Sequence, residues 1–344
     1  MNVSERTCSR CDCPRGVLIA GCGYLGTRLA QLWLREGVSV SAITRHAHRA
    51  ESLAAAGISP VLLDLSRPEA AGAVPADSLV LPAVDVVVWS VGFDRSAGVS
   101  REAIWIDGLA RLTELLSTTP SPRRLIYVSS TGVYGDAGGE EVDETHPPQP
   151  VTESGECCWR AEQHLRQRMS LRHPNTDVTV LRMAGIYGPD RLLRRITDLR
   201  NGAPVTSPPD EWLNLIHVDD AAALVNAASL CLPLPAVTNV VNSGTLTRRE
   251  YYSRLADLTQ SPPPVFAAAS PSEGAAELSG RRSGNKRVVS RHRRDFPVDF
   301  RFDDVADGLA DAVRRTMLLR NASVDDGVSL RNSTNKAAFR DNRY

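Results

Sequence analysis

Short apolar runs alternate with stretches of helical periodicity along the first part of the chain. Each run spans four to eight residues with few polar positions, which is typical of a buried parallel strand. Six strands are predicted at residues 17–20, 38–43, 61–65, 84–91, 125–128 and 178–181, with the clearest helices at 104–116 and 152–168. The pattern therefore predicts the α/β class and a Rossmann fold, a doubly wound parallel sheet covered by helices on both faces.

A glycine turn follows the first apolar run and has the spacing of a dinucleotide-binding motif. It reads Gly21-Cys22-Gly23-Tyr24-Leu25-Gly26, and a stretch of helical periodicity follows it as far as Gly37. The first glycine permits the sharp bend, the second lets backbone approach the phosphates, and the third lets the helix pack close to the strand. Since the amino end of the helix would face the anion, these six residues are predicted to hold the pyrophosphate of a dinucleotide.

The end of the second predicted strand bears on the choice of nucleotide. An acidic side chain there would bind the ribose 2′-hydroxyl of NAD, whereas an Arg accommodates the 2′-phosphate of NADP. The chain has Thr44 and Arg45 at this point, with Arg49 nearby and no Asp or Glu. We therefore expect NADP(H) rather than NAD(H), the alternative being that Arg45 is a solvated surface charge.

Length and charge narrow the class of partner. The 344 residues carry 40 basic and 40 acidic side chains, so no global field attracts nucleic acid or an anionic membrane. No segment approaches the ~20 consecutive apolar residues of a spanning helix, and the amino terminus lacks the apolar region of a signal peptide. We expect a cytoplasmic protein with a small-molecule substrate and neither nucleic acid nor membrane as a partner.

The seven cysteines predict neither a disulfide framework nor a metal centre. An odd number in a chain of this size and class argues against disulfides. Cys8, Cys11 and Cys13 resemble part of a metal-ligand run, but a structural zinc site needs four ligands and no second paired cluster follows. No metal is predicted, and residues 1–15 are expected to form a disordered leader in which these cysteines are accidental.

Four motifs in a fixed order give the chain a family resemblance. The glycine turn is followed by Ser129-Ser130-Thr131-Gly132-Val133-Tyr134-Gly135, by residues 181–189 (LRMAGIYGP) and by residues 214–220 (NLIHVDD). In this order they resemble the extended short-chain dehydrogenase/reductase superfamily, the NAD-dependent epimerase/dehydratase family, from about residue 16 to residue 318. Residues 150–155 (PVTESG) resemble the atypical branch typified by the bacterial YeeZ proteins.

The resemblance implies a division of the chain. Members bind the dinucleotide in an amino-terminal Rossmann domain, here 16–180 with 215–245 returning to it. They bind the substrate, often a nucleotide sugar, in a smaller carboxy-terminal region, here 181–214 and 246–318. Residues 319–344 are polar and are expected to form a disordered tail. By analogy at the level of the fold, the protein is expected to form a homodimer.

The resemblance also implies roles for single residues. Asp64 would lie near the adenine, and Ser90, at the end of the fourth strand, would lie along the cofactor. Ala184 and Gly185 would lie near the nicotinamide. Thr131 would occupy the position of the catalytic Ser or Thr.

The chain departs from the family pattern at the catalytic pair. Typical members carry Tyr-x-x-x-Lys on the helix after the fifth strand, where the Lys lowers the pKa of the Tyr that moves the substrate proton. Aligned on Gly155, the Tyr position is Ser154 and the Lys position is Cys158. An aliphatic hydroxyl is a far poorer base, and losing a positioned general base typically costs about 10² to 10⁴ in rate.

Other side chains could replace the missing pair, and each has a plainer interpretation. Tyr134 is close in sequence to Thr131, but it could pack under the fifth strand. Glu153 precedes Ser154, but it could be an ordinary first-turn helix charge. A thiol of Cys157 or Cys158 could be activated in an electropositive pocket, but one of the two would face the core.

The run from His217 to Asp220 looks like an acid–base pair, and the sequence favours a structural interpretation. We expect it to fix the domain junction, with Asp219 as the N-cap of the following helix. Three functions stay open from the sequence, of which a metal protein that uses the amino-terminal cysteines Cys8, Cys11 and Cys13 is the least favoured. The other two are enzymatic and non-enzymatic uses of the dinucleotide site. One is an NADP(H)-dependent oxidoreductase or epimerase with a non-standard proton donor drawn from Thr131, Tyr134 and Ser154, and the other is a dinucleotide-binding sensor or scaffold that has lost redox chemistry.

Overall fold

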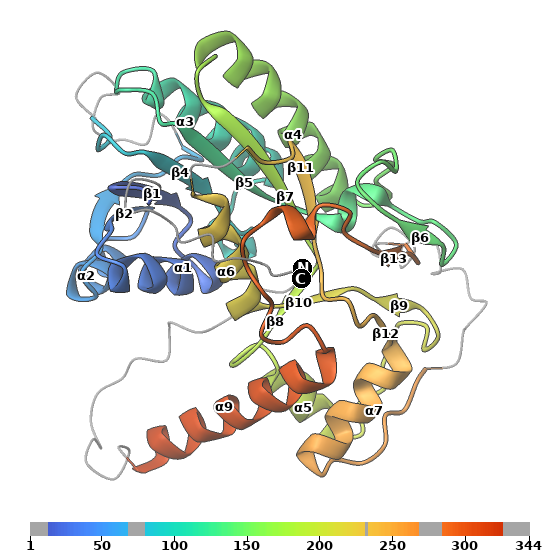
Figure 1. The fold of residues 1–344 in the computed structure, drawn as a ribbon. Coiled ribbons are helices and arrows are strands. Elements are labelled where there is room, and N and C mark those ends of the chain that lie inside the picture. Colours follow the sequence, from blue (N-terminus) through green and yellow to red (C-terminus); the bar gives the residue numbers. More distant parts are fainter. Residues whose placement is uncertain (1–12, 68–79, 231–232, 268–283, 326–344) are drawn as a thin grey trace, which may run out of the picture.

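A seven-stranded parallel sheet forms the centre of the molecule (Figure 1). The computed structural model describes residues 13–67, 80–230, 233–267 and 284–325. The strand order is β11-β7-β5-β4-β1-β2-β3, which is the doubly wound Rossmann arrangement predicted from the sequence. The strands span β1 Gly16–Ala20, β2 Ser39–Thr44, β3 Ser59–Leu62, β4 Val86–Trp89, β5 Arg124–Ser130, β7 Asp177–Met183 and β11 Val237–Val240.

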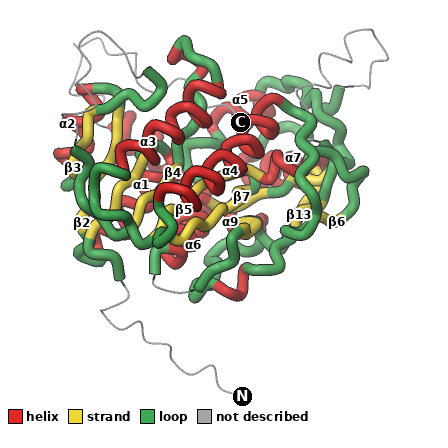
Figure 2. The backbone as a smooth tube through the Cα atoms, turned by 90° about the horizontal axis from the view of Figure 1, so that it is seen from above, coloured by secondary structure: helices red, strands yellow, loops and turns green. Residues whose placement is uncertain are grey.

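Helices cover both faces of the sheet, as Figures 1 and 2 show. Successive side chains of a strand point to opposite faces, so Val17 and Ile19 of β1 enter one apolar core while Leu18 and Ala20 enter the other. The first core is closed by α1 Tyr24–Arg35 and α6 Val218–Ala228, and the second by α3 Gly108–Leu116 and α4 Glu153–Arg172. Helix α2 (Ala47–Ala55) connects β2 to β3.

A smaller region with its own apolar core lies below the sheet in Figure 1. Its helices are α5 Leu193–Arg200, α7 Arg248–Thr259 and α9 Val305–Asp325. Three two-stranded ribbons join it to the sheet: β8 Gly185–Tyr187 with β10 Leu215–His217, β9 Trp212–Leu213 with β12 Leu246–Thr247, and β6 Glu141–Val142 with β13 Arg287–Val288. Short helical turns complete the described chain: η2 Arg95–Ala97, η3 Ala103–Asp107, η4 Thr131–Tyr134 and η5 Arg293–Asp295.

Several boundaries differ from the sequence prediction. The seventh strand, β11, was not predicted, and the helix predicted at 104–116 begins with the π-helical turn η3. Helix α9 continues to Asp325, so residues 319–325 are helical and the prediction of a disordered tail is wrong there. Residues 1–12 and 326–344 lie outside the described residues, and so do Cys8 and Cys11. Among the described helices, none is both long and apolar enough to cross a membrane.

The N-cap of α6 is also corrected. The cap is His217, whose Nδ1 accepts a hydrogen bond of 3.2 Å from the backbone N–H of Asp219. Asp219 itself lies in the first turn of the helix, where its negative charge is favourable. The prediction of Asp219 as N-cap is therefore wrong by two positions.

Candidate functional site

In the glycine turn between β1 and α1, two glycines are crowded by neighbouring backbone and one faces open space. Gly21 has φ +90°, and a Cβ there would lie 2.6 Å from the carbonyl oxygen of Ser90. A Cβ on Gly26 would lie 2.7 Å from the carbonyl oxygen of Gly21, whereas a Cβ on Gly23 would meet nothing within 4 Å. The first and third glycines are therefore needed for packing, and the second leaves space in front of the amino end of α1.

Basic side chains follow β2 beside this turn. Arg49 donates from Nη2 to the carbonyl oxygen of Cys22 at 3.0 Å and to Oγ1 of Thr27 at 3.1 Å, so its guanidinium touches the glycine turn. Arg45, at the position predicted for 2′-phosphate recognition, is instead paired with Asp94. The structure thus brings Arg49 to the turn and gives Arg45 an acidic partner.

The other cofactor candidates lie at the same edge of the sheet, where parallel strands end. Ser90 follows β4 and donates from Oγ to the carbonyl oxygen of Gly21 at 2.9 Å. Asp64 follows β3 and accepts two hydrogen bonds from Ser66, one from the backbone N–H at 2.9 Å and one from the hydroxyl at 2.6 Å. Ala184 and Gly185 follow β7, and the backbone N–H of each is used within the fold, on Val240 and on Asn214.

Tyr24 connects the glycine turn to the carboxy-terminal region. Its ring lies between the guanidinium groups of Arg28 and Arg191, each 4.1 Å from the ring centroid. Its hydroxyl donates to the carbonyl oxygen of Pro189 at 2.7 Å, and burial raises the pKa of the phenol to about 12. Leu25, the next residue of the turn, is buried in the core under α1, as is the Cys22 side chain. The side chain of Tyr24 therefore contacts the carboxy-terminal region, and that of Leu25 packs in the core beneath the turn.

Among the catalytic candidates, Tyr134 is enclosed in the core. Its side chain is 0% exposed, and its hydroxyl donates to Oδ1 of Asn239 at 2.8 Å while accepting from Nη1 of Arg182 at 2.9 Å. Burial also raises the pKa of the phenol. With its hydroxyl occupied and its proton held more tightly than usual, Tyr134 is unsuited to exchange a proton with a substrate.

The end of β5 offers a hydroxyl that the sequence analysis did not single out. Thr131 begins η4 and is only 7% exposed. Ser130, one position earlier, is partly exposed, and its Oγ accepts from the backbone N–H of Gly132 at 3.1 Å. Among the described residues its own O–H has no partner, so it is free to donate. Its position before Thr131 and Gly132, as the N-cap of a short turn, is the sequence signal that could have identified it.

The first turn of α4 holds the positions of the missing Tyr and Lys. Ser154 is partly exposed, and its Oγ lies 3.3 Å from Oγ1 of Thr152, the N-cap. Cys158 is buried, and desolvation raises the pKa of its thiol to about 12. Burial raises the pKa of the Cys157 thiol as well. Neither cysteine is therefore an activated nucleophile or a substitute for the positive charge of Lys.

A buried ion pair that was not predicted lies further along α4, where the helix packs on the sheet. Glu162 of α4 is 0% exposed and accepts two hydrogen bonds from Arg182 of β7, at 3.1 Å and 2.7 Å. Ser129 of β5 donates to the same carboxylate at 2.6 Å. The bidentate geometry fixes α4 against β5 and β7, and so fixes Ser130 relative to Ser154.

A second charged cluster joins α6 to α9. His217, Asp219 and Asp311 have ligand-type atoms within 4.8 Å of one another. Arg315 donates to both carboxylates, at 2.6 Å and 3.2 Å, and Nε of Arg28 lies 3.4 Å from Asp219. Arg314 also donates to Asp311, at 2.6 Å. Three guanidinium groups thus surround the two carboxylates, so we interpret the cluster as a junction between elements rather than a cation site.

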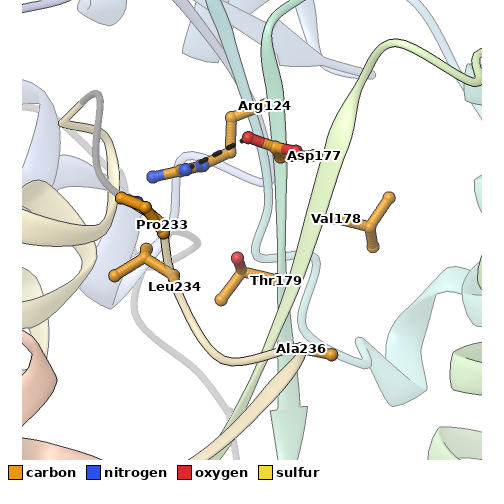
Figure 3. A pocket seen from close by; sticks show the side chains of 7 residues that line it. All are labelled: Arg124, Asp177, Val178, Thr179, Pro233, Leu234 and Ala236. Carbon is orange, nitrogen blue, oxygen red and sulfur yellow. Dashed lines mark hydrogen bonds and ion pairs between the residues drawn. The ribbon is translucent and has the colours of Figure 1, made fainter.

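A cavity of about 250 Å³ lies at the opposite edge of the sheet (Figure 3). Arg124 and Asp177, at the amino ends of β5 and β7, form an ion pair of 3.4 Å in its wall. Since the glycine turn and Ser130 lie at the carboxyl ends of parallel strands, this cavity is separate from the candidate site.

Comparisons with known proteins agree with this geometry. Residues 17–230 match the sequence model of the family described as "NAD dependent epimerase/dehydratase family". Protein YeeZ of Escherichia coli strain K12 is 29% identical over 274 residues, which cover 78% of this chain and 93% of that protein. The solved structure of a functionally unknown conserved protein from Silicibacter pomeroyi DSS is 26% identical with a TM-score of 0.66, and covers 87% of this chain and 98% of its own.

A more distant structure shares the fold. UDP-glucose 4-epimerase of Thermotoga maritima, solved with UDP-glucose, has a TM-score of 0.70 at 17% identity, over 89% of this chain and 99% of that one. The family match covers more than half of the chain and begins at the strand that leads into the glycine turn. The chain belongs to the NAD-dependent epimerase/dehydratase family.

Proposed function

We propose that the protein is an NADP(H)-dependent oxidoreductase or epimerase that acts on a nucleotide sugar or a related hydroxyl or carbonyl compound. The observation that carries the proposal is the open space at Gly23, in front of the amino end of α1 and beside the guanidinium of Arg49. Backbone amides at a helix amino end together with a basic side chain favour a phosphate group. By fold-level analogy, the proposal includes a cytoplasmic homodimer.

The residues around the turn fit the dinucleotide. Gly21, Cys22, Gly23 and Gly26 would hold the pyrophosphate. Arg49 and Arg45 would bind the 2′-phosphate, an assignment favoured because Thr44 and Arg45, rather than an Asp or Glu, stand at the end of β2. Asp64, Ser90 and the pair Ala184 and Gly185 follow β3, β4 and β7 at the same edge of the sheet. When bound, the nicotinamide supplies hydride transfer, and the side chains of this chain bind, orient and exchange the proton.

The proton exchange is the unusual part of the proposed reaction. Ser130, Thr131 and Ser154 contribute hydroxyls around the contact between η4 and α4, where a Cβ on Gly155 would lie 2.6 Å from the carbonyl oxygen of Gly132. Hydroxyls can orient a substrate oxygen, but they are weak bases. We therefore expect slow turnover, lower by about 10² to 10⁴ than with a positioned general base.

The carboxy-terminal region would hold the rest of the substrate. The Thermotoga maritima epimerase, which shares the fold, was solved with UDP-glucose. The ribbons β8–β10 and β9–β12 bring the carboxy-terminal region against the carboxyl edge of the sheet, which is where ligands of doubly wound sheets bind. This placement supports a nucleotide sugar as the substrate class.

Calorimetric titration with NADPH and NADH tests the proposal. We expect NADPH to bind at least about tenfold more tightly, equivalent to about 1.4 kcal/mol, and Arg49→Ala to reduce this preference. Arg35→Ala, in the exposed last turn of α1, is the matched control and should leave both affinities unchanged. Tighter binding of NADH would remove the NADP assignment, and no binding of either nucleotide at millimolar concentration would remove the proposed function.

A further inference from the structure

Arg101 lies beside the positions of the missing Tyr and Lys, and packing alone does not explain why a charged side chain stands there. It comes just before the π-helical turn η3, which packs against α4. Its side chain is only 16% exposed, and its nearest acidic contact is Oε2 of Glu153, 3.6 Å from Nε. Glu153 directly precedes Ser154 in the first turn of α4. Arg101, in the segment that follows β4, therefore reaches the first turn of α4.

Aromatic rings hold the guanidinium in place. Its Cζ lies 4.0 Å from the ring centroid of Phe93 and 5.6 Å from that of Trp105. Trp105 is itself fixed, because its Nε1 donates to the carbonyl oxygen of Val91 at 2.9 Å. Stacking of this kind orients a guanidinium without using its N–H donors.

The terminal amines of Arg101 are left unused. Among the described residues, neither Nη1 nor Nη2 of Arg101 makes a hydrogen bond, and the contact with Glu153 at 3.6 Å is an ion pair beyond hydrogen-bond distance. Glu153 is 75% exposed, and such exposed pairs contribute little energy. A mostly buried guanidinium that stacks on an aromatic ring and makes no hydrogen bond through Nη1 or Nη2 can bind two oxygens of one anion.

Its charge is felt at the position where the family carries Lys. The guanidinium lowers the pKa of Cys158 and of Cys157, in opposition to the dominant effect of burial. Arg101 is therefore a positive charge near the first turn of α4, supplied from the start of the helical segment that contains η3 rather than from α4 itself. Unlike a Lys, it offers two parallel donors with a planar geometry that suits a carboxylate or phosphate.

We propose that Arg101 binds a carboxylate or phosphate group on the reacting half of the substrate, next to Ser154 and Ser130. The inference rests on the proposed function, because it takes the glycine turn to hold the dinucleotide. Glu153 is the counter-charge that the anion displaces. The substrate class is thereby narrowed to sugars or small carbonyl compounds that carry an anionic group close to the reacting carbon.

Nitrogen-15 NMR of the arginine Nε–H groups tests the proposal without requiring turnover. The Arg101 signal is assigned by its loss in Arg101→Lys, and the protein is titrated with acetate and with inorganic phosphate, each with and without NADPH. We expect a saturable shift of the Arg101 signal, and the anion that saturates it at lower concentration identifies carboxylate or phosphate as the preferred group. In Arg101→Gln, anion affinity measured by calorimetry should fall about tenfold to 100-fold.

Arg160 provides the matched control. It joins the same two parts of the fold, with Nη2 donating to Oε1 of Glu102 at 2.6 Å, but it is 48% exposed and already bonded. Its signal should not shift saturably. If neither anion moves the Arg101 signal more than that of Arg160, the inference is overturned. A signal moved by NADPH alone, with anion binding then blocked, would also overturn it by assigning Arg101 to the cofactor.

The two proposals fail in different ways. If NADPH binds neither the wild-type protein nor Arg101→Gln while anions still shift the Arg101 signal, the dinucleotide assignment fails and the anion site stands. If NADPH binds both proteins equally and no anion shifts the signal, the anion site fails and the dinucleotide assignment stands. Thermal unfolding of each variant shows whether the fold is retained.

Discussion

Glu162 and Arg182 are an ion pair taken almost completely out of water, at 0% and 3% exposure. Hydrogen bonds offset the cost of burying the two charges: both carboxylate oxygens accept from Arg182, and Ser129 donates a third hydrogen bond. Tyr134 completes the group by accepting from the same guanidinium. This network, rather than a catalytic role, explains why a tyrosine stands at position 134.

Removing one partner of this pair should be costly. Arg182→Met leaves the Glu162 carboxylate buried without its charge partner, and the free energy of unfolding should fall by about 3–5 kcal/mol. Chemical denaturation followed by circular dichroism measures the loss. Arg249→Met, which breaks the exposed pair with Asp210, should cost less than about 1 kcal/mol. A similar small loss in both variants would contradict this account of the buried pair.

What the sequence reveals about a residue depends on whether its partner is near in the chain. The roles of Gly21 and Gly26 were predicted because a local turn dictates them, and the structure confirms the crowding on both. The environment of Tyr134 was not predictable, since its partners Arg182 and Asn239 lie 48 and 105 positions away. Arg101 escaped notice for the same reason, because Glu153 reaches it from another element.

At the scale of elements, the glycines of the turn between β1 and α1 differ in how closely their surroundings pack. A Cβ on Gly26 meets backbone at 2.7 Å, whereas a Cβ on Gly23 meets only open space. Gly26 is therefore required for packing and Gly23 is not, as the different roles of the two glycines in the motif predict.

Alanine at each position should reveal this difference. Gly26→Ala must displace α1 from β1, so the free energy of unfolding should fall by about 1–3 kcal/mol. Gly23→Ala should change stability by no more than about 0.5 kcal/mol yet weaken NADPH binding, because the added methyl group occupies the space left for phosphate. Calorimetry and denaturation on both variants give the comparison, and normal NADPH binding by Gly23→Ala would contradict the proposed location.

Elements were predictable where apolar pattern and position agree. Strands β1, β2, β4, β5 and β7 follow their predicted apolar runs because most of their side chains are buried. Strand β3 lies at the edge of the sheet, where Leu62 is 55% exposed, and it spans residues 59–62 instead of the predicted 61–65. Strand β11 was missed because it contains Thr238 and Asn239, polar residues that are nevertheless 0% and 1% exposed. Asn239 is satisfied there by Tyr134, Glu144 and Val289, none of which is local in sequence.

At the scale of the whole molecule, His217 lies where the sheet, α6 and α9 meet. Its side chain is 0% exposed, and its ring centroid lies 4.2 Å from that of Phe302, in a tilted arrangement, and 5.2 Å from that of Tyr187, edge to face. Burial lowers its pKa to about 4, against the opposing pull of Asp219 and Asp311 and with the help of Arg315 and Arg28. The neutral imidazole is therefore part of the folded state.

This pKa gives stability a defined dependence on pH. Between about pH 6.5 and 4 the unfolded chain protonates His217 while the folded protein does not, so the free energy of unfolding should fall on acidification by up to about 1.4 kcal/mol per pH unit. His217→Asn keeps an N-cap acceptor and should flatten this part of the profile. His48→Asn, at an exposed position, should leave it unchanged, and identical profiles for all three proteins would contradict the assignment.

The attachment of α6 to the end of the chain has a consequence for synthesis. Asp220, buried at the start of α6, accepts from the backbone N–H groups of Arg301 and Phe302, and Asp219 is paired with Arg315 of α9. A nascent chain that has emerged only as far as β11 carries both carboxylates without these partners. We expect co-translational folding of the nucleotide-binding half to stay incomplete until α9 has left the ribosome, so that fragments ending after β11 would be captured by chaperones or degraded.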